Sequence, residues 1–436
     1  MNTGLSADTL LPLWEKVPDR ADEGSPHAQD VTLTNTSSFT SRVRAMLHGI
    51  ALGDALGAPV EKLSAAEIKS RYGRVTSLDA RWQKMDLPLE QRNYRIRGNG
   101  IVTDDTLMTL ALMDIYADTG RHLDAWDMAD GMVRQIAWTP RWIPEMQRET
   151  NLIDRLFYPE KWIFQRHQLS GCDPRQGGIG NMVNCGAAMY IAPVGVVNAA
   201  DPRGAYDEAI AFAQAHQQSY GLEAAGVFAA AVAAAFVPGT TIKTIVETAL
   251  SLAKDGTRAA IAEIAEAATA LREAGADYDH VVAEFHRIIA AYSPMGDDVN
   301  HSASKAGIPT AAYQPSRLGA IEELPLALGF ALFNAGHFRT SIEDGINSGR
   351  DTDSIGVMAG AILGALHGER VIEAADRAML DNANRFDLTA SADEFTRVAT
   401  GILLADRDHR AAADRARDTL FAAAAAAMPA ASVVNL

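Results

Sequence analysis

Residues 349–368, GRDTDSIGVMAGAILGALHG, carry the pattern that decides the fold. No residue between Ile355 and Leu366 is charged, and glycine recurs at every fourth position from Gly356 to Gly368. Residues four apart share one face of a helix, so these glycines form a single stripe. Glycine inside a helix costs about 1 kcal/mol relative to alanine. We therefore expect that another backbone element approaches this stripe very closely.

Acidic and hydroxyl side chains open this apolar helix, at Asp351, Asp353 and Ser354. One interpretation is helix capping, because Asp and Ser side chains accept the free amide hydrogens of a first turn. The other is a functional site, which requires further acidic groups. The sequence supplies such groups at residues 103–105, Thr-Asp-Asp, which open a second apolar helix.

Each cluster holds more acids and hydroxyls than a cap requires, and each precedes a helix that must pack inside. Clustered carboxylates at such a buried rim are costly unless a cation compensates for their charge. Carboxylate and hydroxyl oxygens are ligands for Mg²⁺, Mn²⁺ or Ca²⁺, whereas zinc takes mainly nitrogen and sulfur. Neither cluster has a His or Cys beside it in the sequence, so we predict a hard-cation site.

A further acidic residue follows the glycine-rich helix that ends near residue 57. The helix breaks at Gly57–Pro59 and delivers Glu61 on the loop just beyond. A carboxylate on a rigid turn after a buried helix is suited to acid–base catalysis. It is equally compatible with a surface loop, and both interpretations remain open from this stretch alone.

Most of the chain has the apolar spacing of helices, and few segments alternate with the period of a strand. Connectors rich in Gly and Pro cover 169–186 and 293–317, and we expect Asp297 and Asp298 in a solvated loop there. We predict an all-α fold with a polar extension over 1–38, one compact multi-helix domain over 39–425 and a tail over 426–436. The expected helices are 42–56, 104–116, 123–139, 202–216, 222–237, 241–252, 259–274, 280–291, 322–334, 341–345, 353–366 and 395–422.

Composition excludes several classes of function. The 436 residues are 48% hydrophobic and carry a formal net charge of −16 without any long basic run, so a nucleic-acid or anionic-membrane partner is not expected. Only Cys172 and Cys185 are present and form no CxxC pair, which suits a reducing compartment. The N-terminus lacks the pattern of a secretory signal, and the longest apolar run, 224–237, is too short to span a bilayer. We expect a cytoplasmic protein.

Taken in order, the stretches 53–61 (GDALGAPVE), 103–106 (TDDT) and 349–354 (GRDTDS) resemble the motifs of the ADP-ribosylglycohydrolase family. This family includes the dinitrogenase-reductase-activating glycohydrolases and the ADP-ribosyl-acceptor hydrolases. The resemblance runs from about residue 42 to 368 and also includes 186–193, GAAMYIAP. It implies the all-α fold of that family with a binuclear Mg²⁺ centre, or Mn²⁺ as the alternative metal.

The resemblance also implies roles for individual residues. Glu61 falls at the position of the acidic residue near the scissile bond, and Asp105 and Asp353 are assigned to catalysis with it. The metal ligands that it implies are Thr103, Asp104 and Asp105 on one side, and Asp351, Asp353 and Ser354 on the other.

Substrate contacts are expected at several further positions. A glycine-rich loop is suited to holding a diphosphate on its backbone amides, and residues 177–180 are the candidate, with a flexible connector as the other interpretation. Gly186 belongs to a matched motif, and His216 either faces the site or is a hydrogen-bonded core histidine. The expected substrate-binding residues are Gly177, Gly178, Gly180, Gly186 and His216.

Three departures from the family pattern leave the substrate open. Cys185 stands where the family commonly has Asn, Tyr190 stands where it has Arg, and Ser354 replaces Thr while keeping a hydroxyl. The leading hypothesis is a Mg²⁺-dependent hydrolase that releases ADP-ribose from a modified protein side chain or a small ADP-ribosyl molecule. The alternatives are a hydrolase of another N-riboside, such as a nucleoside or nucleotide metabolite, and a non-catalytic protein that binds an ADP-ribosylating enzyme or toxin.

Overall fold

The apolar stretch with the glycine stripe forms helix α14 (Thr352–His367), and every residue of it from Thr352 to Ala365 is buried. The chain is described here from a computed structural model over residues 30–292 and 322–427. The predicted loop containing Asp297 and Asp298 lies outside these residues, as do most of the predicted extension and tail. Residues from Phe39 onward group into one compact unit.

Helix α14 lies against helix α1 (Asp30–Gly57) with almost no space between the two backbones. A Cβ atom added at Gly360 would lie 2.1 Å from the carbonyl oxygen of Gly49, and one at Gly356 would lie 2.7 Å from that of Gly53. One at Gly364 would lie 2.3 Å from the carbonyl oxygen of Ala45. The close approach predicted from the sequence is therefore present, and α1 supplies the facing backbone.

The two helices run antiparallel, as the order of these contacts shows. Gly57, at the end of α1, meets the backbone of Thr352 and Asp353 at the start of α14. The hydroxyl of Thr352 donates to the carbonyl oxygen of Gly57 at 2.9 Å. The fourth glycine of the stripe, Gly368, instead ends α14 with a φ of 72°. The crossing thus carries the loop after α1 to the acidic start of α14.

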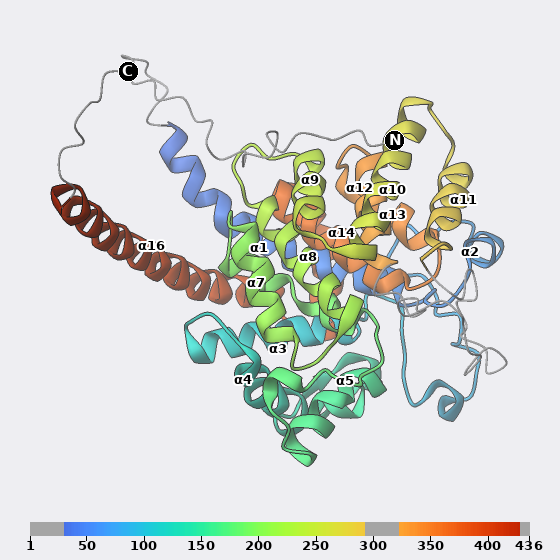
Figure 1. The fold of residues 1–436 in the computed structure, drawn as a ribbon. Helices are drawn as coiled ribbons and strands as arrows, with labels where there is room; N and C mark the ends of the chain where they lie inside the picture. Colours follow the sequence, from blue (N-terminus) through green and yellow to red (C-terminus); the bar gives the residue numbers. More distant parts are fainter. Residues whose placement is uncertain (1–29, 293–321, 428–436) are drawn as a thin grey trace, which may run out of the picture. The chain divides into compact units, whose positions relative to one another are not determined.

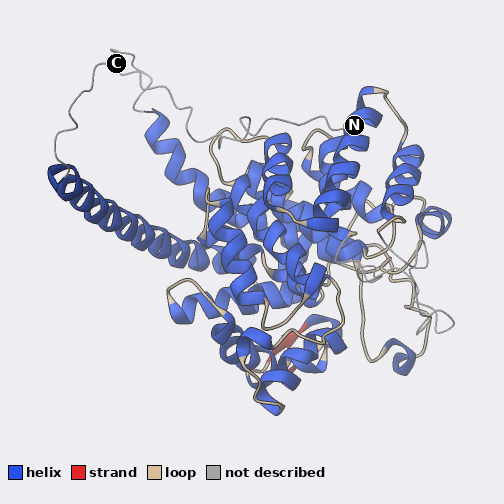
Figure 2. Cartoon of the chain, in the orientation of Figure 1, coloured by secondary structure: helices blue, strands red, loops and turns tan. Residues whose placement is uncertain are grey.

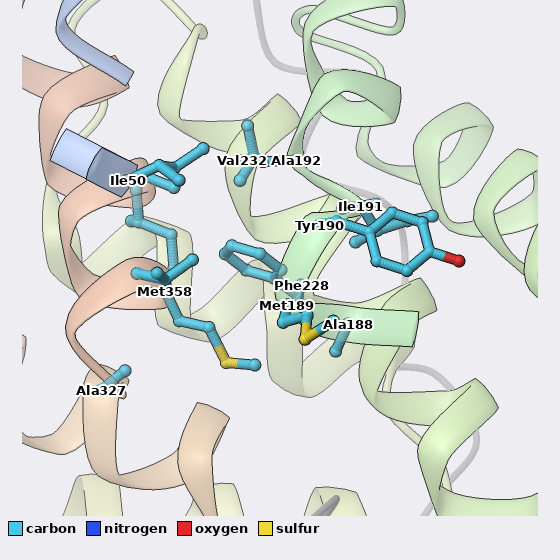
Figure 3. Close-up of a cluster of buried hydrophobic side chains, with 14 of the residues drawn as sticks. Ile50, Ala188, Met189, Tyr190, Ile191, Ala192, Phe228, Val232, Ala327 and Met358 are labelled. Carbon is cyan, nitrogen blue, oxygen red and sulfur yellow. The ribbon is translucent and has the colours of Figure 1, made fainter. Parts of the chain in front are cut away.

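Other helices surround this pair. Helices α8 (Ser219–Ala235), α12 (Glu323–Phe333) and α13 (Phe338–Asn347) pack on α14. Figure 3 shows part of the core between them, with Ile50 and Met358 facing Phe228. Because α8 is hydrophobic almost all round, it can be buried on most of its surface.

The remaining elements follow in chain order and are almost all helical (Figures 1 and 2). Two three-residue strands form an antiparallel pair in which Trp142 faces Glu149. The elements are α2 (Ala65–Tyr72), η3 (Leu89–Arg92), α3 (Asp104–Thr119), α4 (Ala125–Asp127), η4 (Met128–Met132), η5 (Arg134–Trp138), β1 (Arg141–Ile143), η6 (Pro144–Met146), β2 (Arg148–Thr150), η7 (Leu152–Asp154), α5 (Tyr158–Ile163), η8 (Phe164–Leu169), η9 (Pro174–Gln176), η10 (Cys185–Tyr190), α6 (Ala192–Val197), α7 (Pro202–Ala213), α9 (Ile242–Leu252), α10 (Asp255–Glu273), α11 (Tyr278–Ile289), η11 (Glu369–Val371), α15 (Ala374–Asn384) and α16 (Leu388–Ala427).

The predicted all-α class is confirmed, and each expected segment contains helix. The expected helices did not include α2, α5, α6 or α15. Of these, α2 buries only Ile68, and α15 buries only Leu380 and Asn384. The helix α1 begins at Asp30, so the last residues of the predicted extension are helical. Within residues 30–292 and 322–427, no helix combines the length and apolar character needed to cross a bilayer.

The α1–α14 crossing predicts opposite effects for two glycine-to-alanine changes. Gly360→Ala should lower the thermal unfolding midpoint, because its methyl group would overlap the backbone of Gly49, and overpacking typically costs ~1–3 kcal/mol. Gly401→Ala in α16 should leave the midpoint unchanged or raise it, because nothing lies within 4 Å of the added Cβ and alanine favours helix. Equal midpoints for the two variants would contradict the proposed role of the crossing.

Candidate active site

The acidic starts of α3 and α14 meet in the folded chain. The hydroxyl of Ser354, in the first turn of α14, donates to Oδ1 of Asp105 in α3 at 3.1 Å. The hydroxyl of Thr103, just before α3, lies 3.2 Å from Asp104 Oδ1. Two clusters that are almost 250 residues apart in the sequence therefore form one site.

The N-cap residues of the two clusters do not cap their own helices. Thr103 and Asp351 occupy the N-cap positions of α3 and α14, and neither side chain makes a capping hydrogen bond. Instead, Asp54 of α1 accepts hydrogen bonds from the amides of Thr103 and Thr106 at 2.9 and 3.1 Å, and from the Thr106 hydroxyl at 2.5 Å. Because Asp54 satisfies the first turn of α3, the carboxylates of that turn remain available to the cavity. At the start of α14, Asp353 Oδ1 accepts a hydrogen bond from the amide of Ser354 at 3.2 Å, so one carboxyl of that cluster does bind a first-turn amide. The capping interpretation is therefore wrong for the N-cap residues Thr103 and Asp351.

These carboxyl groups are buried close to one another. Burial, and then the charges of Asp54 and Asp104, raise the pKa of Asp105 well above its usual range. Burial, followed by the charges of Glu61 and Asp351, does the same to the pKa of Asp353. Such a cluster is unfavourable in its ionised form unless a cation neutralises it.

The arrangement of the donor atoms fits bound cations. Three groups of side chains each place three ligand atoms within 4.8 Å of one another: Asp54, Asp105 and Asp353; Glu61, Asp351 and Asp353; and Cys185, Glu323 and Asp351. The first two groups share Asp353 and offer oxygen atoms only, which suits Mg²⁺ or Mn²⁺. Of the predicted carboxylate ligands, Asp105, Asp351 and Asp353 belong to these groups, whereas Asp104 lies outside them and forms an ion pair with Arg155. Asp54, Cys185 and Glu323 were not predicted to take part.

Glu61 lies at the end of an alternating ion-pair chain. The chain runs from Asp104 through Arg155, Glu145 and Arg97 to Glu61, which also contacts Lys62. The Arg97 Nε–Glu145 Oε1 distance is 2.7 Å, and the Lys62 Nζ–Glu61 Oε1 distance is 3.2 Å.

This series of ion pairs keeps Glu61 negatively charged. Burial alone would raise the pKa of Glu61, but the charges of Arg97 and Lys62 outweigh it and hold the pKa well below its usual range. Glu61 is therefore a carboxylate at neutral pH. It faces Asp351 and Asp353 from inside the site, so the surface-loop interpretation does not hold.

A cavity of about 370 Å³ opens over these groups. Carboxylates form one part of its wall, and exposed aromatic and apolar side chains form its rim. The lining residues are Glu61, Lys62, Arg97, Asp104, Asp105, Phe157, Tyr158, Pro159, Glu160, Met182, Asn184, Cys185, Met189, Asp351, Asp353 and Ser354.

Glu160 is a site residue that sequence reasoning missed. It is 2% exposed, its Oε1 accepts a hydrogen bond from Asn184 Nδ2 at 3.2 Å, and its Oε2 has no partner among the described residues. Burial, and then the charge of Asp104, raise its pKa to about 7. A Cβ at Gly186 would lie 2.3 Å from Glu160 Oε1, so glycine there makes room for this carboxyl. Nothing in the local pattern of residues 157–163 marks Glu160 as functional.

The predicted glycine loop does not form a wall of this cavity. Gly177, Gly178 and Gly180 are absent from its lining. The amide of Gly177 donates to the carbonyl of Pro174 at 3.1 Å, and that of Gly178 donates to Gln214 at 2.9 Å. These two amides are occupied within the protein, so the interpretation as a diphosphate cradle is wrong for them.

His216 is a core residue. It is fully buried, its Nδ1 lies 2.9 Å from the hydroxyl of Tyr190, and its Nε2 lies 3.2 Å from the carbonyl oxygen of Pro159. Burial lowers its pKa to about 3, so the ring is neutral. The prediction that His216 binds substrate is therefore not supported, and Tyr190 likewise points away from the cavity. Of the departures from the family pattern, Cys185 and Ser354 lie in the lining.

Comparisons with known proteins show which family the chain resembles. A model of the ADP-ribosylglycohydrolase family matches residues 35–424. YegU, an uncharacterized protein of Escherichia coli K12, is 28% identical over 377 residues, which make up 83% of this chain and 96% of YegU. An uncharacterized protein of Archaeoglobus fulgidus is 26% identical over 324 residues, covering 74% of this chain and 87% of that protein. A solved chain of an ADP-ribosylglycohydrolase-related protein complex aligns with a TM-score of 0.50 at 20% identity, covering 83% of this chain and 99% of that one; this likeness concerns the fold.

The buried carboxylates predict how added Mg²⁺ and pH together change stability. A carboxyl whose pKa is raised in the folded state binds more protons when folded, so without a cation it lowers stability as the pH rises above about 4. A bound cation favours the ionised form. The increase in Tm on replacing EDTA by Mg²⁺ should therefore be larger at pH 8 than at pH 6.

Asp353→Asn is the matched variant, because it removes a charge shared by two ligand groups and nearly keeps the shape. It should lose most of the Mg²⁺-dependent increase in Tm. An increase that is independent of pH, or that persists in Asp353→Asn, would show that the cation binds elsewhere.

Proposed function

The chain belongs to the ADP-ribosylglycohydrolase family, and we propose that it is a metal-dependent hydrolase of the ribosyl bond in an ADP-ribosylated protein side chain or a related small ADP-ribosyl molecule. Family membership supports glycohydrolase activity in general. The observation that carries the proposal is the convergence of carboxylates from the loop after α1 and from the starts of α3 and α14 in one cavity.

The residues present fit two divalent cations. Asp353 belongs to both oxygen-only groups, with Glu61 and Asp351 on one side and Asp105 on the other. When bound there, Mg²⁺ or Mn²⁺ would balance the carboxylate charge and lower the pKa of a water molecule. Ser354 lines the cavity and its hydroxyl lies 3.1 Å from Asp105 Oδ1, which adds an oxygen atom to this carboxylate wall. Thr103 is fully buried outside the lining, with its hydroxyl 3.2 Å from Asp104 Oδ1.

The electrostatics of the cavity suit hydrolysis at an anomeric carbon. Glycoside cleavage passes through a state with positive charge on the sugar, and a wall of fixed carboxylates stabilises that charge. Glu61 keeps its negative charge because Arg97 and Lys62 hold it, so it can orient an attacking water molecule and accept its proton.

A second proton-transfer group is needed for the leaving group, and Glu160 is suited to that task. Its pKa of about 7 means that it is protonated in a large fraction of molecules at neutral pH. Glu160 lines the cavity, its Oε1 accepts a hydrogen bond from Asn184, and its buried Oε2 has no partner among the described residues. Two carboxyl groups with such different pKa values divide the acid and base functions between them.

The proposal predicts turnover of ADP-ribosylated substrates that depends on a divalent cation. A panel of proteins ADP-ribosylated on arginine or serine, a small O-linked ADP-ribosyl ester and free nucleosides would be incubated with Mg²⁺ or with EDTA. ADP-ribose should be released from at least one of the ADP-ribosylated substrates with Mg²⁺ and not with EDTA, and Asp353→Asn should fail to release it. Hydrolysis of nucleosides alone would favour the alternative N-riboside activity, and no hydrolysis at all would contradict the proposal.

Substitutions should separate the roles of the two glutamates. Glu61→Gln should still bind Mg²⁺, because the group of Asp54, Asp105 and Asp353 does not include Glu61. This variant should lower kcat/KM by at least roughly a hundredfold at every pH, as expected for loss of a base. In the parent protein kcat/KM should fall above pH 7 as Glu160 loses its proton; Glu160→Gln should be slower and lose this pH dependence. Loss of Mg²⁺ binding in Glu61→Gln would instead make Glu61 mainly a ligand, and an unchanged pH profile in Glu160→Gln would remove it from the reaction.

A further inference from the structure

A second, smaller cavity of about 80 Å³ adjoins the candidate active site. Its wall shares Glu61, Lys62, Arg97 and Phe157 with the larger cavity, and the rest comes mainly from residues 82–95. The volume corresponds to roughly two or three water molecules. It suits a single small oxyanion and is too small for a sugar or a base.

The charges around this small cavity do not balance. In the alternating ion-pair chain described above, three cations already match three carboxylates. Lys84, Arg92 and Arg95 also line the cavity and lie outside that chain. None of the three has an ion-pair partner within the described part of the chain. In a protein with a net charge of −16, three uncompensated cations therefore gather at one place.

These cations are held in place by other contacts. Arg95 donates to the backbone carbonyl of Arg155, and its guanidinium lies over the ring of Phe157, 5.0 Å from the centroid. Arg92 donates through Nη1 to Met85 Sδ at 3.1 Å, while its buried Nε has no partner among the described residues. The guanidinium groups are thus preorganised while keeping unused hydrogen-bond donors.

The local environment penalises this positive charge when nothing neutralises it. Burial, and then the neighbouring cation Arg155, lower the pKa of Arg95. The pKa of Lys84 is likewise lowered, by burial and then by Lys62 and Arg97 against the opposing effect of Glu61. An anion bound among these groups would remove the mutual repulsion and use the free donors.

We propose that this second cavity is a subsite for a phosphate monoester, which the substrate would carry in addition to the diphosphate of its ADP-ribosyl group. A phosphate dianion matches the three spare cations better than a singly charged carboxylate, and arginine forks suit its several oxygens. Glu61 lies on the wall common to both cavities, so a substrate can place its reacting sugar against the carboxylates and its phosphate among the cations. Binding of phosphate itself goes beyond the proposed hydrolase function and does not depend on it; only the assignment to the substrate rests on that function.

The test is titration of the full chain with inorganic phosphate by calorimetry at low salt, in Mg²⁺ and again in EDTA. EDTA removes divalent cations, so any phosphate binding that depends on cations in the carboxylate site is lost in EDTA. The double variant Arg92→Gln/Arg95→Gln should bind phosphate at least about tenfold more weakly, because it removes two charged donors. Arg81→Gln is the matched control: Arg81 is exposed in the same loop region, pairs with Asp86 and should leave phosphate affinity unchanged.

A second variant tests the proposal even if the double variant fails to fold. Lys84→Gln changes a side chain that is only partly covered and still reaches solvent, so it should weaken phosphate binding without lowering Tm. Acetate should compete poorly with phosphate. Equal phosphate affinity in the double variant and the Arg81→Gln control would overturn the proposal, as would loss of the EDTA-resistant binding in Asp353→Asn, which would transfer it to the carboxylate site.

Competition identifies the source of the phosphate. Ribose 5-phosphate should displace inorganic phosphate in EDTA, and ribose should not. If ribose 5-phosphate fails to displace it, the site takes free phosphate only and its assignment to the substrate is overturned. Phosphate binding that persists in a protein without hydrolase activity would contradict the proposed function and leave the anion subsite in place.

Discussion

The backbone contact between α1 and α14 is the constraint on which the site depends. Glycines on both helices let the chains approach until the space for even one methyl group is gone. Each of these glycines costs about 1 kcal/mol of helix propensity, and the close packing of the crossing offsets that cost. Because the helices are antiparallel, the contact sets the end of α1 directly beside the start of α14. The loop with Glu61 and the acids of α14 are therefore positioned by the same crossing.

Helix α3 is connected to the pair of α1 and α14 by hydrogen bonds to one side chain, that of Asp54. Asp54 of α1 accepts the hydrogen bonds of the amides at the start of α3, which leaves Asp105 available to the cavity and Asp104 available to pair with Arg155. Carboxylates consequently gather on one wall of the site. On the other side, the ion-pair chain through Arg155, Glu145 and Arg97 alternates in sign, so Glu61 stays ionised although its burial opposes that charge. The fold thus holds one acid permanently charged and leaves Glu160 able to change its protonation state near neutral pH.

Features that lie within one segment could be predicted from the sequence, whereas contacts between residues far apart in the sequence could not. The stripe of glycines and the two acidic helix starts are periodic features of single segments, so they predicted helix, close approach and a shared site. The role of Asp54 depends on Thr106, 52 residues away, and that of Arg97 depends on Glu145, 48 residues away. Glu160 acquires its pKa only from burial in the assembled cavity, which no segment encodes alone. Conversely, Gly177 and Gly178 have the composition of a phosphate loop, yet the fold uses their amides for its own carbonyls.

The glycines at the contact between α1 and α14 also limit which substitutions this protein can accept during evolution. In most cores, a larger residue on one helix can be accommodated when its neighbour on the facing helix becomes smaller. At Gly49–Gly360 and Gly53–Gly356 both members are already glycine, and the atoms that a new side chain would strike belong to the backbone. No second substitution at the facing position can restore the fit. A lineage that enlarges one of these residues must move the helices apart, and it then also separates Glu61 from the carboxylates it faces.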